Sequence, residues 1–233
     1  MRIPEGAGAL YLVTNSNQIR NRIQAMKLLV IGATGMVGSR IVTEALGRGH
    51  EVIGAARSPE KLAAAPGLTP LKLEVTDGAA VAAAAGGVDA IIGAVSPRST
   101  GNPAEEMAAI MKGYIDGATG AGKPLVVVGG AGTLNLPDGT PVADVVPEMY
   151  APEAKAMRAA YALLEASDAD YSFLAPAGEI APGDKTGTFR TGGREYLTDA
   201  DGNSRISAED FAIALLDEAE SPSHKRAVFT VAY

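Results

Sequence analysis

The sequence predicts an α/β protein built on a doubly wound parallel sheet, with helices packed against both faces. From Met26 onward, short apolar segments alternate with amphipathic or alanine-rich stretches of helical length. The composition agrees, because 47% of the residues are hydrophobic, only 5% are aromatic and tryptophan is absent. A core of Ala, Val, Leu and Ile suits a parallel sheet that is buried on both faces. The 233 residues suffice for one large domain of this kind.

Each predicted strand is a short apolar run that ends at Gly, Pro or a polar residue. Strands are expected at residues 27–31, 51–55, 70–74, 89–94, 123–129 and 171–175. The run at 123–129 is largely apolar and therefore predicts a central strand. Helices are expected at 36–47, from Ser58 (the N-cap, with Pro59 first in the helix), at 78–86, at 102–118 and at 152–167.

The pattern changes after about residue 175. Segments 186–190 and 194–197 flank Thr191-Gly192-Gly193, which predicts a β-hairpin. Ser207 and Asp210 form the start of a capping box for a helix that runs to about residue 219, and 227–231 predicts a last strand. We expect this part to form a small C-terminal lobe on the substrate side of the sheet, over its carboxyl edge.

Residues 1–25 differ from the rest, because they are loop-like and polar apart from one short apolar piece. We expect an extension outside the fold, with residues 26–233 as a single domain; an arm that docks on the domain or on a second subunit is the alternative. That piece is too short for a signal-peptide core, and no apolar run reaches transmembrane length. The lack of cysteine excludes disulfides and is compatible with a reducing compartment, so we expect a cytoplasmic protein.

The net charge of −7 and the absence of a basic cluster argue against nucleic acid as a partner. We expect a small-molecule substrate, no membrane partner, and a monomer or dimer. His50 and His224 stand far apart, and the run 199–203 places its glycine wrongly for an EF-hand, so no metal site is predicted.

The strongest motif is the glycine loop that follows the first strand. Glycines spaced G-x-x-G-x-x-G join that strand to the start of an amphipathic helix, which is the context that a nucleotide pyrophosphate requires. Missing Cβ atoms let backbone approach phosphate, and the helix N-terminus offers free N–H groups. An ordinary βα turn seldom carries three glycines in this register. The loop predicts dinucleotide binding by Gly32, Thr34, Gly35, Met36, Val37 and Gly38.

The end of the second strand indicates which dinucleotide binds. No carboxylate stands there to accept a hydrogen bond from a ribose 2′-hydroxyl. The strand end carries Arg57 in its place, followed by Ser58 at a predicted helix N-cap. A guanidinium can pair bidentately with a 2′-phosphate, so we expect NADP(H) to be preferred over NAD(H). A solvated surface arginine is the alternative. Past the third strand, Thr76 and Asp77 are expected beside the adenine, although Asp77 could equally cap the next helix.

Small residues end the fourth and fifth strands, where the nicotinamide half of the cofactor is expected. These are Ala94, Val95 and Ser96, and then Gly130 and Thr133 in the run 129–133. We expect Thr133 to orient the substrate; a hydrogen bond to nearby backbone is the alternative. No Lys has a Tyr four residues before it, so a Tyr/Lys proton relay is not expected, and Tyr150 is expected to contact substrate from a loop.

These residues together resemble the atypical short-chain dehydrogenase/reductases that bind NAD(P)H, in particular the NmrA-like and biliverdin-IXβ/flavin reductase group. The resemblance rests on the glycine loop, Arg57-Ser58, Thr76-Asp77, the run 129–133, and the segments 150–153, 173–176 and 204–210. It implies a Rossmann fold, NADP(H) in an extended pose, and Pro176 packed near the nicotinamide. Thr133 stands where similar proteins often have Ser.

The predicted function is an NADP(H)-dependent reductase that acts on a planar acceptor such as a flavin, a quinone or a carbonyl compound. Thr133 and Tyr150 are the expected substrate-side residues. Because the Tyr/Lys pair is missing, a regulatory protein that senses NADP(H) without catalysis is the first alternative. An epimerase or dehydratase is the second, and it is disfavoured because those reactions usually rely on a Tyr base.

Overall fold

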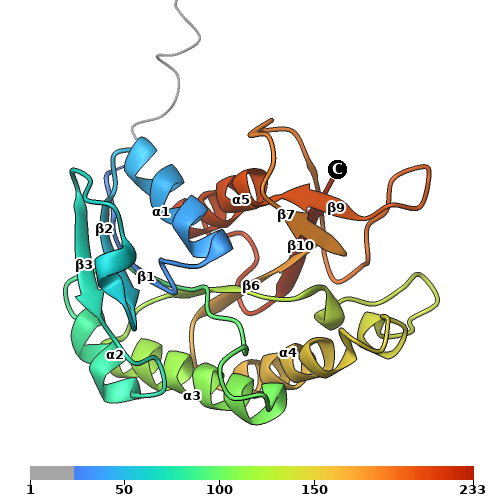
Figure 1. Cartoon of the computed structure of the whole chain (residues 1–233), viewed down its shortest axis with the longest axis horizontal. Helices are drawn as coiled ribbons and strands as arrows, with labels where there is room; N and C mark the ends of the chain where they lie inside the picture. Colours follow the sequence, from blue (N-terminus) through green and yellow to red (C-terminus); the bar gives the residue numbers. More distant parts are fainter. Residues whose placement is uncertain (1–23) are drawn as a thin grey trace, which may run out of the picture.

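A computed structural model describes residues 24–233, which form a mixed sheet covered by helices on both faces (Figure 1). The sheet has eight strands in the order β3-β2-β1-β4-β5-β6-β10-β8. Seven of them are parallel, and β8 runs antiparallel to β10. The bounds are β1 Lys27–Ile31, β2 Glu51–Ala56, β3 Leu68–Lys72, β4 Ala90–Gly93, β5 Leu125–Val128, β6 Tyr171–Pro176, β8 Arg190–Gly192 and β10 Val228–Ala232. The predicted doubly wound fold is confirmed.

The helices lie in two layers. On one face α1 packs against α5, and on the other α2, α3 and α4 lie side by side (Figure 1). Their bounds are α1 Met36–Gly47, α2 Gly78–Ala85, α3 Pro103–Ala121, α4 Ala151–Glu165 and α5 Ala208–Glu220. Strand residues alternate between two cores: Leu29 and Ile91 face α2 and α3, whereas Leu28 and Ile92 face α1 and α5. This alternation is why the central strands are apolar throughout.

The strand order places a topological switch point at β1. The chain moves outward through β2 and β3, and then crosses back to add β4 on the other side of β1. Loops that follow β1 and β4 therefore diverge at the carboxyl edge, where α/β sheets hold their ligands.

Several predicted boundaries shift. Strand β3 begins two residues earlier than expected, and it keeps Pro70 because an edge strand tolerates a missing N–H donor. The helix predicted from Ser58 is only the 3-10 turn η1 Pro59–Lys61, and the Ser58 side chain makes no capping hydrogen bond. Ser207 does cap α5, accepting from the N–H of Asp210 at 3.0 Å.

The hairpin predicted around Thr191-Gly192-Gly193 is wrong. Strand β8 pairs with β10, about forty residues away, with Thr191 opposite Val231. Segment 194–197 forms no strand, because its backbone bonds the loop after β5: the N–H of Tyr196 donates to the carbonyl of Asn135. The short strands β7 Glu179–Ala181 and β9 Arg205–Ser207 form a separate parallel pair. The C-terminal segment thus reaches the carboxyl edge of the sheet by long-range contacts.

Most of the segment 1–25 lies outside the described residues, which begin at 24. Within residues 24–233, no helix combines the length and the apolar character needed to cross a membrane.

Candidate cofactor and substrate site

The glycine loop after β1 has a backbone that only glycine permits at two positions. Gly32 has φ +91°, and a Cβ there would lie 2.5 Å from the carbonyl oxygen of Ala94 at the end of β4. A Cβ on Gly38 would lie 2.1 Å from the carbonyl oxygen of Gly32, so this glycine lets α1 pack directly on its own loop. The loop is thereby held against β4, at the switch point of the sheet.

The N-terminus of α1 is the one helix start, among the five α-helices described, that has neither a side-chain cap nor an acidic residue in its first turn. Its N-cap is Gly35, whereas side chains cap α2, α3 and α5 and Glu153 lies in the first turn of α4. The free N–H groups and the positive end of the helix dipole suit an anion. A nucleotide pyrophosphate fits this terminus.

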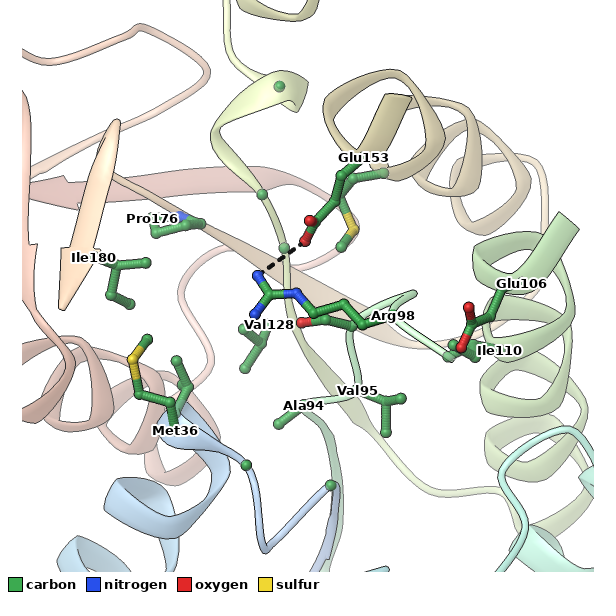
Figure 2. Close-up of a pocket in the computed structure, with 18 of the residues that line it drawn as sticks. Met36, Ala94, Val95, Arg98, Glu106, Ile110, Val128, Glu153, Pro176 and Ile180 are labelled. Carbon is green, nitrogen blue, oxygen red and sulfur yellow. Dashed lines mark hydrogen bonds and ion pairs between the residues drawn. The ribbon is translucent and has the colours of Figure 1, made fainter. Parts of the chain in front are cut away.

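A cavity of about 860 Å³ runs along the carboxyl edge from this loop. Its walls come from the ends of β1 to β6, the N-terminal parts of α3 and α4, and the C-terminal segment at Gly178, Ile180 and Tyr196. Figure 2 shows the glycine loop with Met36 on one side and α4 with Glu153 on the other. The cavity is long enough to border every loop that the sequence predicted for the cofactor.

Thirteen of the predicted residues line this cavity: Gly32, Thr34, Gly35, Met36, Val37, Arg57, Thr76, Ala94, Val95, Ser96, Gly130, Tyr150 and Pro176. Four others are absent from its walls, namely Gly38, Ser58, Asp77 and Thr133. Gly38 supports the loop from behind, as described above. Asp77 caps α2 by accepting from the N–H of Ala80 at 3.0 Å, which is the alternative that its position left open.

Thr133 does not line the cavity, and its hydroxyl makes the hydrogen bond to nearby backbone that the sequence left as the alternative. Its side chain is fully buried, and its hydroxyl donates to the carbonyl of Gly130 at 2.7 Å. The cause is the 3-10 turn η2 Ala131–Thr133, which folds the hydroxyl back onto its own loop. The guanidinium groups of Arg158 and Arg194 donate to the Thr133 carbonyl at 3.3 and 3.0 Å and hold the turn in place.

Sequence reasoning missed several polar residues of the cavity, among them Arg98, Glu106, Glu153 and Tyr196. Glu106 and Glu153 carry the ordinary signature of first-turn helix acids, and nothing local separates that role from a ligand site. Arg98 lies in the loop after β4, and Tyr196 lies in the C-terminal segment between β8 and β9. Only the arrangement in space brings these four together.

Tyr150 and Tyr196 are the tyrosines that line the cavity, and no lysine lines it within the described part of the chain. Tyr150 is the N-cap of α4 and is 57% exposed at the rim. Residues 24–233 contain no cluster of three or more His, Asp or Glu side chains placed to hold a metal ion. Among the described residues, the cleft therefore has no lysine beside a tyrosine.

The fold and this cleft define a nucleotide-binding α/β protein of the Rossmann type. The chain belongs to the NAD(P)H-binding family, whose model matches residues 32–222. YwnB of Bacillus subtilis, an uncharacterized protein, is 33% identical over 214 residues, which span 88% of this chain and 98% of that protein.

Solved structures with similar folds carry differing names. A candidate exported protein from Burkholderia pseudomallei is 41% identical, with a TM-score of 0.80 over 89% of this chain and 100% of that one. A candidate epimerase from Bacteroides thetaiotaomicron is 36% identical, with a TM-score of 0.83 over 90% of this chain and 98% of that one. A candidate NADH-flavin reductase from Streptococcus pneumoniae is 30% identical, with a TM-score of 0.79 over 89% and 99%.

Proposed function

We propose that this protein is an NADP(H)-dependent reductase that transfers a hydride to a planar small molecule such as a flavin, a quinone or a carbonyl compound. The observation that carries the proposal is the extent of the cavity. Beyond the terminus of α1 it continues past Gly130 to apolar walls formed by Val142, Val146 and Met157. That space lies next to the expected nicotinamide position and suits a flat, apolar acceptor.

Different residues of the chain would bind different parts of the cofactor. The first turn of α1 would hold the pyrophosphate, and Arg57, which lines the cavity, would read the 2′-phosphate. Thr76 and Pro176 both line the cavity, and we expect Thr76 to border the adenosine and Pro176 to border the nicotinamide. A reduced nicotinamide, when bound, supplies the hydride. The acceptor would lie against the apolar walls and contact Tyr150 at the exposed rim, where solvent can supply the proton.

The name of the Streptococcus pneumoniae relative supports a flavin as the first acceptor to test. The Bacteroides thetaiotaomicron relative is named as a candidate epimerase, but a tyrosine base in such reactions usually works with a lysine four residues after it, and this chain has no such pair. No lysine lines the cavity among the described residues, which disfavours that chemistry here.

The test is turnover of purified protein with NADPH against flavins, quinones and aldehydes, followed by the loss of NADPH absorbance. The expected result is loss of NADPH absorbance with at least one acceptor, at a rate that falls when deuterium replaces hydrogen on one face of the NADPH nicotinamide, and with retention of that deuterium on carbon where the acceptor is an aldehyde. Tight NADPH binding with no turnover on the whole panel would favour the sensing protein instead. Interconversion of sugar epimers without net NADPH loss would favour the epimerase.

A further inference from the structure

Arg98 projects into the middle of the cavity from the loop between β4 and α3. Its side chain is 74% exposed, and its Nη2 donates to Oε1 of Glu153, on α4, at 3.3 Å. Figure 2 shows the guanidinium reaching across the cleft to Glu153, over Val128 at the end of β5. The arginine therefore stands between the glycine loop and the apolar acceptor space.

The loop that carries Arg98 is fixed on both sides. The Glu106 carboxylate accepts from the N–H groups of Ser99 at 2.9 Å and Thr100 at 3.1 Å, and Pro97 is buried. Burial raises the pKa of Glu106, but these hydrogen bonds outweigh it and hold the pKa below its ordinary value. Glu106 is thus committed to the loop backbone, and the Arg98 guanidinium is left to face the cavity.

Most of the hydrogen-bond donors of Arg98 have no partner among the protein atoms of residues 24–233. A guanidinium has five N–H donors, and the bond to Glu153 is the one that this guanidinium makes within residues 24–233. That pair is long and exposed, so it holds Arg98 weakly. Arg57 and Arg98 are the cationic side chains of the described cavity wall, and Arg57 stands at the far end, after β2. An anionic group in the acceptor space would meet Arg98 first.

We propose that Arg98 binds an oxyanion carried by the acceptor, a carboxylate, phosphate or sulfonate, and that Glu153 is the partner it leaves to do so. The inference rests on the proposed reductase function and narrows its substrate class to a planar acceptor with an acidic substituent. The ring lies against the apolar walls at Val142 and Met157, and the oxyanion takes the free guanidinium donors. Glu153 keeps the guanidinium extended into the cleft until the acceptor arrives.

The test compares FMN with riboflavin, which share one ring system and differ by a phosphate. Binding of each to NADP⁺-saturated protein is followed by flavin fluorescence, so that no hydride transfer is needed. We expect wild-type protein to bind FMN about tenfold more tightly than riboflavin, as one charge-assisted contact allows. Arg98→Ala should bring that ratio close to one with riboflavin binding unchanged, and Arg98→Lys should keep part of it. Glu153→Gln, which removes the competing carboxylate, should raise the ratio.

Lys155→Ala is the matched control, because it removes the same charge from a position on α4 outside the cavity wall. The comparison is repeated on a smaller ring with benzaldehyde and 4-carboxybenzaldehyde, whose affinities are measured by their competition with the fluorescent flavin. An unchanged ratio in Arg98→Ala, or no preference for the acid in either pair, would overturn the proposal. So would an equal loss of NADP⁺ affinity, which would assign Arg98 to the cofactor. An Arg98-dependent preference without turnover would keep this inference and reject the reductase; turnover without that preference would do the reverse.

Discussion

The hydroxyl of Tyr114 accepts a hydrogen bond from the backbone N–H of Val95 at 3.0 Å, just past the end of β4. The ring is fully buried on α3 and lies where a side chain on Gly93 would stand, since a Cβ there would come within 2.6 Å of it. Burial raises the pKa of Tyr114, so the hydroxyl stays neutral. Tyr114 thus fixes the start of the loop that places Ser96 and Arg98 in the cavity wall.

Tyr114→Phe should loosen this loop with little change in packing. The Val95 N–H would lose its acceptor, at a cost of about 1–2 kcal/mol in the free energy of unfolding. NADPH affinity should fall as well, because the loop borders the cavity. Urea unfolding and NADPH titration measure the two effects.

Tyr171→Phe is the matched control, because the Tyr171 hydroxyl donates to the carbonyl of Arg226 at 3.2 Å. Tyr171 begins β6, so this bond lies at the amino ends of the strands, away from the cavity. This variant should lower stability and leave NADPH affinity unchanged. Equal NADPH affinity in the two variants would contradict the proposed support of the site by Tyr114.

Gly32→Ala should abolish cofactor binding and destabilise the fold. A left-handed backbone costs a non-glycine residue about 1–2 kcal/mol, and here the methyl group would also strike Ala94. Gly49→Ala supplies the comparison, because Gly49 has φ +86° and its new methyl group would meet no atom within 4 Å. Both variants should unfold earlier than wild type in thermal melts, and only Gly32→Ala should lose NADPH binding. Retained binding in Gly32→Ala would place the cofactor elsewhere.

The sequence predicts those parts of the site whose geometry is local. The glycine loop is such a case, because a strand, three spaced glycines and a helix start all lie within a dozen residues. The roles of Thr133 and Asp77 are not decided locally, since each hydroxyl or carboxylate can turn toward a ligand or toward its own backbone. In both cases the side chain forms a hydrogen bond with nearby backbone: the Thr133 hydroxyl donates to the carbonyl of Gly130, and the Asp77 carboxylate accepts from the N–H of Ala80.

Long-range contacts explain the remaining differences. Strand β8 is paired by β10 and not by the segment that follows it, so the turn residues at Gly192-Gly193 indicate a hairpin that does not form. Arg98 and Glu153 are fifty-five residues apart and meet only because α3 and α4 pack on the same face of the sheet. No spacing rule connects two such residues.

Glu218 should make the protein sensitive to acid. Its buried carboxylate accepts from the hydroxyl of Ser172 at 2.6 Å, lies 2.8 Å from Nδ1 of the His224 ring, and accepts from the backbone N–H groups of His224 and Ser223. Burial raises the pKa of Glu218, but these bonds outweigh it and hold the pKa below its ordinary value of 4.5. A lowered carboxyl pKa contributes stability that is complete above the unfolded value and is lost as the pH falls through the folded value.

Glu218→Gln should therefore unfold more easily than wild type at neutral pH, by about 1–3 kcal/mol, and the gap should close as the pH falls below 4.5. Urea titrations across that range measure it. Glu148→Gln, at an exposed position, is expected to track wild type throughout. A gap that stays constant with pH would mean that the Glu218 charge contributes nothing.

Arg57→Ala should separate the two nicotinamide cofactors. Arg57 is exposed on the cavity wall after β2, and within residues 24–233 it forms no salt bridge, so its charge is available to a 2′-phosphate. Loss of a charge-assisted contact should weaken NADPH binding about tenfold or more and leave NADH binding nearly unchanged. Fluorescence titration with both cofactors measures the ratio. Lys123→Ala, before β5 and outside the cavity wall, controls for net charge.

The competing hypothesis is a preference for NAD(H), and Glu74 is the residue that would produce it. This carboxylate also lines the cavity, after β3, where it accepts from the hydroxyl of Thr76 at 3.3 Å. If Glu74 reads a ribose 2′-hydroxyl, Glu74→Gln should weaken NADH binding and Arg57→Ala should affect both cofactors equally. If Arg57 reads the phosphate, Glu74→Gln should leave NADH unchanged and strengthen NADPH, because it removes a negative charge near the 2′-phosphate.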